Sequence, residues 1–312
     1  MPSNATPETR AACARWNALV VVATVAIAAL VAGLNYRVNL YGVFGNPAGK
    51  KLVVYDNERT TKYLFSYNYI PMNFDGVLVG TSISDNWDTS HIAGMRVYNA
   101  SINGGNISEE ALLLRNILGR TRPRTVLFVV HPYLTESSGR KSGYMNAQEY
   151  WGALGSIQLA RVYWNKFLIT HHGRRQEFND FGQDDYDVHV APAALQEILN
   201  AGEAMPVDPL AMKEYRELLD RARASGARVV GVIPPVSADL WKRQRDLYQA
   251  YYAQILPLFH ADEPVIDFNS SEFSSLRSDP DNFPDGIHLS RSAAAHVVDA
   301  LNEKLEAVRA AK

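Results

Sequence analysis

The chain has 312 residues, of which 47% are apolar and 21% are charged, a composition typical of a globular protein. Its formal net charge is -2 and its Lys and Arg residues are scattered, so it lacks the clustered basic surface that nucleic-acid binding requires. Cys13 is the single cysteine, which excludes an intrachain disulfide and a thiolate metal cage. We therefore expect neither a nucleic-acid partner nor a cofactor.

The first predicted element is a membrane-spanning helix near the N-terminus. The run from Ala18 to Leu34 carries no charge, and a helix of this length spans roughly 26 Å, slightly less than a bilayer's hydrocarbon core. Trp16 and Tyr36 flank the run, and their amphipathic rings suit the two membrane interfaces. The alternatives are a cleaved signal peptide, with its site among the small residues at 31–33, and a buried core helix.

The arginines around this run set its expected orientation. Arg10 and Arg15 precede it and Arg37 follows it, so the positive charge slightly favours a cytoplasmic N-terminus. We expect a single-pass protein of the inner (cytoplasmic) membrane whose body faces the periplasm or the cell exterior. The expected parts are a cytoplasmic N-terminus, a transmembrane anchor, a connector and an α/β domain, at residues 1–17, 18–34, 35–74 and 75–312.

Beyond the connector, short apolar runs alternate with amphipathic stretches. This alternation is typical of a parallel sheet whose strands are joined by helices. The expected strands cover residues 76–79, 96–99, 125–130, 227–233 and 264–268. We therefore predict an α/β fold, a doubly wound (flavodoxin-like) three-layer α/β/α arrangement around a central parallel sheet, preceded by one N-terminal transmembrane helix.

Helical stretches separate the predicted strands. The clearest cover residues 108–118, 209–224, 238–258 and 290 to about 310, with a further candidate at 57–67 in the connector. Asp208 followed by Pro209 is a favourable helix start. The alternation fails between about 134 and 207, a stretch too long for a plain loop. We interpret it as an insertion with some helices, placed where loops of such sheets build a substrate site.

Gly80-Thr81-Ser82 directly follows the first strand. A serine at this point lies at the carboxyl edge of the sheet, where the N–H groups of a helix start can stabilise a developing oxyanion. Gly80 allows the tight turn. The alternative role for Ser82 is that of a helix cap, and Ser84 is a competing nucleophile one step deeper in the helix.

Asp285 and His288 stand three residues apart near the C-terminus, with Gly286 between them. This spacing lets the carboxylate orient the imidazole, whose other nitrogen can take a proton from a serine. An ordinary helix-entry turn would have the same spacing. Because the serine follows the first strand and this pair follows the last, all three groups are expected at one edge of the sheet. We predict Ser82, Asp285 and His288 as the catalytic residues.

These motifs resemble the SGNH or GDSL-like hydrolase family. The family's first block, a strand followed by Gly-Asp-Ser, is matched by residues 80–82 with Thr in place of Asp, and its last block, Asp-x-x-His, by residues 285–288. Its second block, Asn-x-Gly-x-Ser-Gly, is similar to residues 99–104. The resemblance implies an oxyanion hole formed by the backbone N–H groups of Ser82 and Gly104.

The family's third block, Gly-x-Asn-Asp after a strand, has no match. The strand at 125–130 is followed by His131-Pro132-Tyr133, so the family's oxyanion asparagine is absent. Asn103, His131 and Tyr133 are the candidates for a substitute donor, and the sequence does not choose among them. Because one such donor contributes about a hundredfold or more to the rate, we expect the change to affect hydrolysis rather than the fold.

The insertion carries two further groups of residues. His171-His172, the run from Asp180 to Asp187 and His189 match no known calcium or zinc ligand spacing, so we expect a polar loop and no metal. The aromatic residues of the insertion are Tyr144, Tyr150, Trp151, Tyr163, Trp164 and Phe167. They could stack on sugar rings, although packing against the sheet is the commoner use of such side chains.

The sequence thus predicts an SGNH-type serine esterase or O-acyltransferase that works through an acyl-enzyme on Ser82. Resemblance to a membrane-tethered subgroup implies a cell-envelope or exopolysaccharide substrate, an acylated carbohydrate or another ester, and a membrane-embedded acyl-transfer partner. The alternative is a catalytically weak or inactive module that binds glycan or a membrane partner in polysaccharide assembly. A phospholipase-like enzyme is the third hypothesis.

Overall fold

The computed structural model describes residues 7–137, 143, 145–186 and 205–310. Its centre is a five-stranded sheet in the order β2-β1-β3-β4-β5, and each neighbouring pair is parallel. The strands are β1 (Gly76–Val79), β2 (Val97–Asn99), β3 (Thr125–Val129), β4 (Arg228–Ile233) and β5 (Val265–Asp267). This order is that of a doubly wound sheet of the flavodoxin type, so the predicted fold class is confirmed.

The strands lie where the apolar runs predicted them and differ only at their ends. All four side-chain positions of β1 are buried, as expected for a parallel strand covered on both faces. β1 pairs with β3 from Gly76 opposite Thr125 to Val79 opposite Phe128. β5 is two residues shorter than predicted, since its pairing with β4 covers only residues 265–267.

Helices connect the strands and cover the sheet. The α-helices are α1 (Pro7–Val38), α2 (Glu58–Phe65), α3 (Tyr69–Asn73), α4 (Ser82–Asp85), α5 (Ile107–Leu118), α6 (Ala147–Gly152), α7 (Ile157–His171), α9 (Pro209–Ala224), α10 (Ala238–Ile255), α11 (Ser274–Ser278) and α12 (Arg291–Ala310). Short 3-10 helices lie at Thr89–His91, Pro132–Leu134, Leu256–Leu258, Ser271–Phe273 and Pro280–Asn282. The predicted start of α9 is confirmed, because Asp208 accepts hydrogen bonds from the N–H groups of Leu210 and Ala211, with Pro209 in the first turn.

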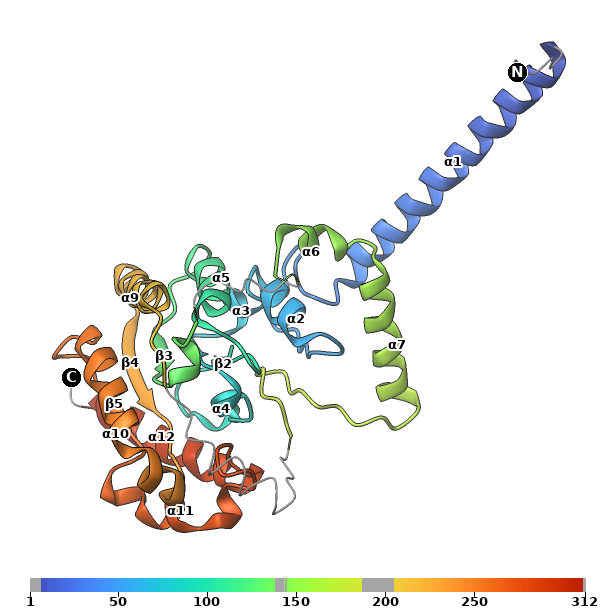
Figure 1. Ribbon diagram of the computed structural model, residues 1–312. Coiled ribbons are helices and arrows are strands. Elements are labelled where there is room, and N and C mark those ends of the chain that lie inside the picture. Colours follow the sequence, from blue (N-terminus) through green and yellow to red (C-terminus); the bar gives the residue numbers. More distant parts are fainter. Residues whose placement is uncertain (1–6, 138–142, 144, 187–204, 311–312) are drawn as a thin grey trace.

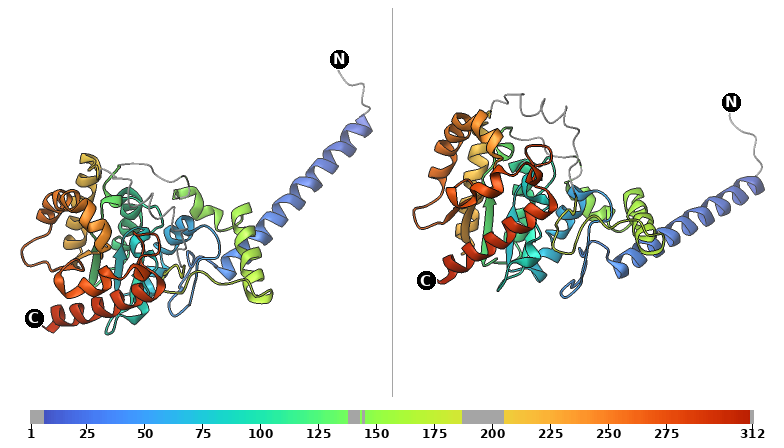
Figure 2. Two further views of the ribbon diagram at one scale, coloured as in Figure 1. Left: turned by 60° about the horizontal axis from the view of Figure 1, so that its bottom comes forward. Right: turned by 90° about the horizontal axis from the view of Figure 1, so that it is seen from below.

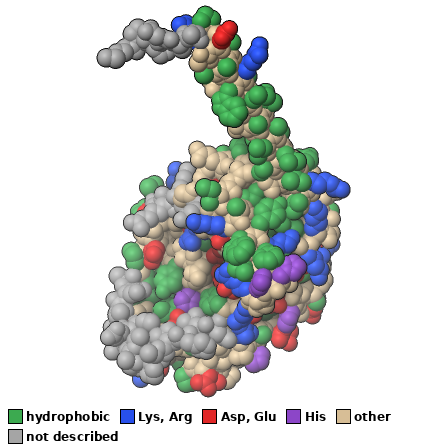
Figure 3. Space-filling model, turned by 90° about the vertical axis from the view of Figure 1, so that its right-hand side faces the viewer, with side chains coloured by type: hydrophobic (Ala, Val, Ile, Leu, Met, Phe, Trp, Pro, Cys, Tyr) green, Lys and Arg blue, Asp and Glu red, His purple; other side chains and the backbone are tan. Residues whose placement is uncertain are grey.

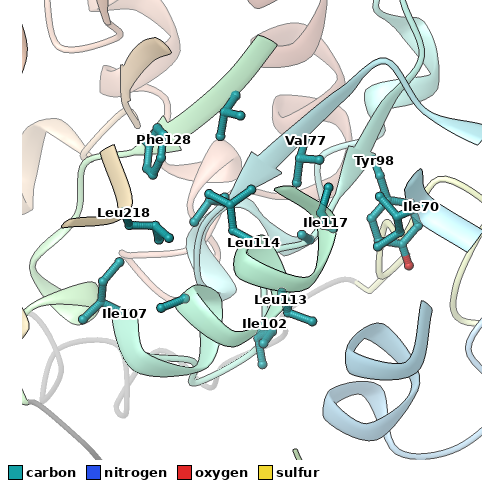
Figure 4. Close-up of a cluster of buried hydrophobic side chains, with 14 of the residues drawn as sticks. Ile70, Val77, Tyr98, Ile102, Ile107, Leu113, Leu114, Ile117, Phe128 and Leu218 are labelled. Carbon is teal, nitrogen blue, oxygen red and sulfur yellow. The ribbon is translucent and has the colours of Figure 1, made fainter. Parts of the chain in front are cut away.

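Two apolar clusters fill the spaces on the two faces of the sheet. α5, α9 and α10 contribute to one cluster and α12 to the other, and the helices form layers on either side of the strands (Figures 1 and 2). In the first layer, Leu114 and Ile117 of α5 and Leu218 of α9 pack with Val77 and Phe128 of the sheet (Figure 4). These interlocking apolar faces produce the three-layer arrangement.

The connector is part of the body. Tyr63, Leu64 and Phe65 of α2 are buried in the same apolar cluster as β1 and α5. The side chain of Asn57 begins α2 by accepting a hydrogen bond from the N–H of Thr60 at 2.9 Å. The stretch between α1 and the sheet therefore belongs to the folded unit that positions the site.

α1 projects from the body as a single long helix (Figure 2). In the described part of the chain it is the one helix long and apolar enough to cross a membrane, with a mean hydropathy of 2.4 in its apolar window. The helix extends beyond the predicted span of 18–34 at both ends, and Asn35 is its buried residue. Length and composition fit the predicted anchor and would also fit a signal sequence.

The insertion divides into two parts with different positions. α6 and α7 lie beside the end of α1, away from the strand ends (Figure 1), whereas the chain after α7 returns to the sheet. There the N–H of Asn99 donates to the carbonyl oxygen of Phe181 at 2.8 Å, and Phe178 forms an isolated bridge with Asp184. Between α6 and residue 186, the predicted position beside the substrate site therefore applies to the segment after α7, and Tyr144, Asp187 and His189 lie outside the described residues.

Candidate active site

Ser82 is placed by a turn between β1 and the short helix α4. The helix begins at Ser82, with Thr81 as its N-cap, so the serine lies at the carboxyl edge of the sheet. A side chain at Gly80 would force its neighbours to move, because a Cβ there would lie 2.1 Å from Oγ of Ser84 and 2.6 Å from Oγ of Ser101. The close approach of these hydroxyls therefore favours glycine at this position, in addition to the tightness of the turn.

Asp285 and His288 lie in a turn that precedes α12. One carboxylate oxygen of Asp285 accepts hydrogen bonds from the N–H groups of Ile287 and His288 at 2.9 and 2.7 Å. Gly286 has φ +81°, a left-handed conformation that side chains disfavour. The side chain of Ser237, at the start of α10, donates to the carbonyl oxygen of Gly286 at 2.8 Å. The turn is thus held from within and by a neighbouring helix.

The structure brings the three predicted catalytic side chains into contact. Nε2 of His288 lies 3.0 Å from Oγ of Ser82, and Nδ1 lies 2.6 Å from the second carboxylate oxygen of Asp285. Nδ2 of Asn86 donates to the carbonyl oxygen of Leu289 at 2.8 Å and joins the two turns directly. Serine, histidine and aspartate therefore form one hydrogen-bonded series across 206 residues of sequence.

The electrostatics of this series keep the aspartate ionised. Burial alone would raise the pKa of Asp285, but the hydrogen bond and charge of His288 and two backbone N–H groups together hold that pKa below its usual value. An ionised carboxylate at Nδ1 fixes the tautomer that leaves Nε2 free to accept a proton from Ser82. The arrangement suits a base that removes the serine proton.

His131 follows β3 and is nearly fully buried, with 4% of its surface exposed. Burial, together with the neighbouring His288, lowers the pKa of His131 to about 3, so its ring is neutral at physiological pH. Nδ1 of His131 accepts a hydrogen bond from the N–H of Tyr133 at 3.4 Å. Because a neutral imidazole carries one proton, that proton is on Nε2, which makes His131 a hydrogen-bond donor at that atom.

The other predicted oxyanion residues have contacts of their own. The N–H of Asn103 donates to a carboxylate oxygen of Glu58 at 3.1 Å, so this group already has an acceptor. The carbonyl oxygen of Gly104 accepts from Arg59 at 2.9 Å, and Tyr133 packs its ring edge-on against His131. The oxyanion roles of the Ser82 and Gly104 N–H groups stay predictions.

Two groups beside Ser82 were not identified from the sequence. The hydroxyl of Tyr186 donates to the carbonyl oxygen of Ser82 at 2.7 Å, and Lys62 forms a buried ion pair with Asp85 at the end of α4. Tyr186 lies in an aspartate-rich stretch without periodicity, so no pattern marked it. The sequence signal for Lys62 was its position directly before the apolar run Tyr63, Leu64 and Phe65 in a predicted helix.

A third group, Asn99, was noticed only as part of the second block. Its side-chain amide donates to the carbonyl oxygens of Ser84, Asp85 and Trp87 at 2.7 to 3.2 Å. Ser84 and Asp85 are the last two residues of α4 and Trp87 lies just beyond it, so this amide caps the C-terminal end of the helix, where carbonyls run out of intrahelical donors. Asn99 therefore fixes the helix that carries Ser82 at its first position.

The acidic and histidine residues of the insertion form no metal site that the structure describes. Within residues 7–137, 143, 145–186 and 205–310, no group of three or more His, Cys, Asp or Glu side chains is placed to hold a metal ion. Asp185 instead pairs with Arg175 at 2.7 Å and with Arg291 at 2.5 Å. These ion pairs hold the returning segment near the start of α12.

The described chain thus combines a parallel sheet between helical layers with a serine, a histidine and an aspartate hydrogen-bonded in series at the carboxyl edge of that sheet. No protein-family model matches the sequence, and no curated protein matches it either. Solved structures that align with it include a candidate acylhydrolase from Bacteroides fragilis NCTC 9343, at 12% identity over 76% of this chain and 86% of that one with a TM-score of 0.39.

Two further solved structures align with the chain. One is a GDSL-like lipase from Bacteroides thetaiotaomicron VPI-5482, at 12% identity over 76% of this chain and 88% of that one with a TM-score of 0.38. The other is a candidate platelet activating factor from Streptococcus pneumonia, at 11% identity over 80% of this chain and 91% of that one with a TM-score of 0.41.

Proposed function

We propose that this protein is a membrane-anchored serine acyl-ester hydrolase or O-acyltransferase of the SGNH type. The observation that carries the proposal is the hydrogen-bonded series of Ser82, His288 and Asp285 at the carboxyl edge of the sheet. The base lies within hydrogen-bonding distance of both the nucleophile and the orienting carboxylate, an arrangement suited to acyl transfer through a serine.

In the proposed reaction, Oγ of Ser82 attacks the acyl carbonyl carbon while its proton passes to Nε2 of His288. Asp285 stabilises the imidazolium, and hydrogen-bond donors stabilise the oxyanion. The tetrahedral intermediate then collapses, and His288 returns the proton to the departing alcohol oxygen. Water or a sugar hydroxyl, deprotonated by His288, resolves the acyl-enzyme, so hydrolysis and transfer differ only in this last acceptor.

The proposed setting is the outer face of the cytoplasmic membrane. α1 supplies the anchor, with its arginine-flanked N-terminus in the cytoplasm, and the body would then meet acylated carbohydrates or other esters of the cell envelope. A membrane-embedded acyl-transfer protein is the expected partner if the enzyme is a transferase. The combination of SGNH-like motifs with an N-terminal apolar helix resembles membrane-tethered proteins of that family, and this resemblance supports the setting.

A serine-reactive phosphonate probe tests whether the protein is an enzyme. We expect the wild-type protein to be labelled, Ser82→Ala to remain unlabelled, and Ser84→Ala to be labelled. Ser84 is the matched control because its hydroxyl is fully buried and bonded to Ser101 at 2.8 Å. Absence of labelling in folded wild-type protein would instead favour a module that binds glycan or a membrane partner.

Within this proposal, His131 supplies the oxyanion contact that the family's asparagine provides elsewhere. His131→Phe keeps a ring but removes the donor, and we expect kcat for a small acetyl ester to fall about a hundredfold or more. His131→Asn restores a neutral donor and is expected to recover part of that loss. Because the pKa of His131 is about 3, the ratio between wild type and His131→Phe should not vary between about pH 5 and pH 9.

Steady-state kinetics across pH provide the measurement for His131. A fall in kcat with little change in KM is expected, because the oxyanion forms only in the transition state. Equal kcat values for the wild type and His131→Phe would show that another group fills this position.

A further inference from the structure

α6 and α7 form a helical hairpin, residues 147–171, that is fastened to the end of α1. The buried side chain of Asn35 donates to the carbonyl oxygen of Leu154 at 2.8 Å and accepts a hydrogen bond from the hydroxyl of Tyr163 at 2.8 Å. A Cβ at Gly155 would lie 3.3 Å from Val31, so the turn of the hairpin touches the last turns of the apolar run. The turn between α6 and α7 therefore lies beside the C-terminal end of the apolar run of α1.

The outer surface of the hairpin is apolar and aromatic. Ile157 is 82% exposed, Trp151 67% and Trp164 60%, and Phe167 stacks on Trp164 with ring centroids 5.6 Å apart. Ile157, Arg161 and Trp164 recur at helical spacing on one side of α7, while Leu159 and Val162 face inward and are buried. Such large exposed side chains in one place mark a surface that contacts something other than water.

Positive charge predominates along α7 and the residues that follow it, although α6 carries Glu149. Residues 157–175 contain Arg161, Lys166, Arg174 and Arg175 and no aspartate or glutamate. The exposed apolar side chains of α1 continue onto the adjoining face of the body, where Lys, Arg and His side chains gather around them (Figure 3). Tryptophan combined with positive charge suits the boundary between acyl chains and anionic headgroups.

A groove of about 880 Å³ separates α1 from the hairpin. Its walls are mostly apolar and include Ala28, Val31 and Leu34 of α1 and Leu154 and Ile157 of the hairpin. One wall of this groove is thus the expected membrane span itself, so whatever fills it lies at the depth of that span. Phospholipid acyl chains have the matching chemistry at this position.

We propose that the hairpin is a second membrane contact, which lies in the outer leaflet of an anionic phospholipid bilayer and fixes how the body sits on it. The proposal rests on the anchor role given to α1 under the proposed function. Continuity of the surface with α1, its tryptophans and the positive charge of α7 favour lipid over a water-soluble partner. A bilayer contact of this kind holds the catalytic edge of the sheet at a set height above the membrane, because the hairpin and the body are packed together.

Site-directed spin labelling of the full chain in liposomes of phosphatidylglycerol and phosphatidylcholine tests the proposal. Cys13 is the single cysteine, so a Cys13→Ser background permits one label at a time, at Ile157→Cys or Trp164→Cys. Val25→Cys in α1 is the control for the anchor. Leu210→Cys, on an apolar residue that is 65% exposed at the start of α9, is the matched control for water exposure.

The accessibility of each label to oxygen, which concentrates in lipid, is compared with that to a water-soluble nickel chelate. We expect the oxygen-to-nickel ratio at 157 and 164 to exceed that at 210 several-fold and to fall toward it when phosphatidylglycerol is omitted. If the labels at positions 157 and 164 are as accessible to nickel as the label at position 210, while the label at position 25 remains in lipid, the hairpin does not contact the bilayer and the anchor role of α1 still stands. Labels at 157 and 164 closed to both reagents would overturn it in favour of a protein partner or a second copy. Water exposure at 25 would overturn the anchor as well.

Discussion

Ser82→Ala should reduce hydrolysis of a small chromogenic acetyl ester on the order of 10⁴-fold or more, since it removes the nucleophile and leaves only binding and oxyanion contacts. The substitution removes one hydroxyl from a residue that is 8% exposed. The carbonyl oxygen of Ser82, which accepts from Tyr186, is unaffected. The loss should therefore appear in kcat while the protein remains folded, and steady-state turnover by the full chain in detergent measures it.

Two companion variants separate catalysis from folding. His288→Ala should give a loss of similar size, because nucleophile and base act as a unit and their effects do not add. Ser84→Ala removes the competing hydroxyl next to the site and should keep turnover of the same order as the wild type. If Ser82→Ala hydrolyses the ester at the wild-type rate, the acyl-enzyme mechanism is wrong, and if all the folded proteins are inactive, a partner-dependent transferase or a binding role takes precedence.

The sequence predicted the sheet well because parallel strands buried on both faces are nearly continuous apolar runs. GVLV at β1, which lies between Asp75 and Gly80, and TVLFV at β3, which follows Arg124, are such runs. The Asp-x-x-His spacing also gave the position of the base, because that geometry is local. The contact of this pair with Ser82 could be predicted from topology alone, because β1 and β5 belong to one parallel sheet and end at the same edge of it.

What the sequence left open depends on contacts between distant segments. Nothing local indicates that Tyr186 reaches the carbonyl oxygen of Ser82, or that Asn86 bonds to Leu289 across 203 residues. His131 could be named as a candidate donor but not preferred to Asn103. The burial that keeps its ring neutral, and the N–H of Tyr133 that fixes its tautomer, exist only in the folded chain.

The aromatic residues of the insertion show the same limit in another way. Tyr150 packs edge-on against Tyr67 and Phe44 of the connector, as a packing role predicts. Trp151 and Trp164 belong to the same aromatic-rich stretch and yet are exposed. Composition identified the group, but only the position of the hairpin beside α1 distinguishes its inward from its outward members.

Lys62 is the connector residue whose loss should cost the most stability. Its side chain is fully buried and its Nζ lies 2.9 Å from Asp85, 2.8 Å from Glu58 and in hydrogen-bonding contact with the carbonyl oxygen of Ser101. Burial opposes its charge, but Asp85 and Glu58 together raise the pKa of Lys62, so the ammonium stays protonated. Lys62→Met keeps the length of the side chain and leaves the buried Asp85 without its counter-ion. We expect the free energy of unfolding to fall by about 3–5 kcal/mol.

Urea unfolding of the full chain in detergent, followed by tryptophan fluorescence to which the buried Trp87 contributes, measures this loss. Lys304→Met is the matched control, because Lys304 forms an ion pair of 2.7 Å with Glu272 in which both side chains are more than a third exposed. Such a surface pair contributes about 0–1 kcal/mol. A loss for Lys62→Met no larger than that of the control would contradict the account of a buried ion pair beneath α4.

The pH dependence of the stability lost in Lys62→Met gives a second, independent test of the buried ion pair. Burial and the charge of Glu58 already raise the pKa of Asp85, and removal of Lys62 takes away the group that opposes them. The folded variant then holds a proton on Asp85 that the unfolded chain releases, so its stability falls as pH rises above the ordinary aspartate pKa. The defect should be smaller at about pH 5 than at about pH 8. Lys62→Met combined with Asp85→Asn should recover part of the loss at the higher pH, because the buried charge is then absent.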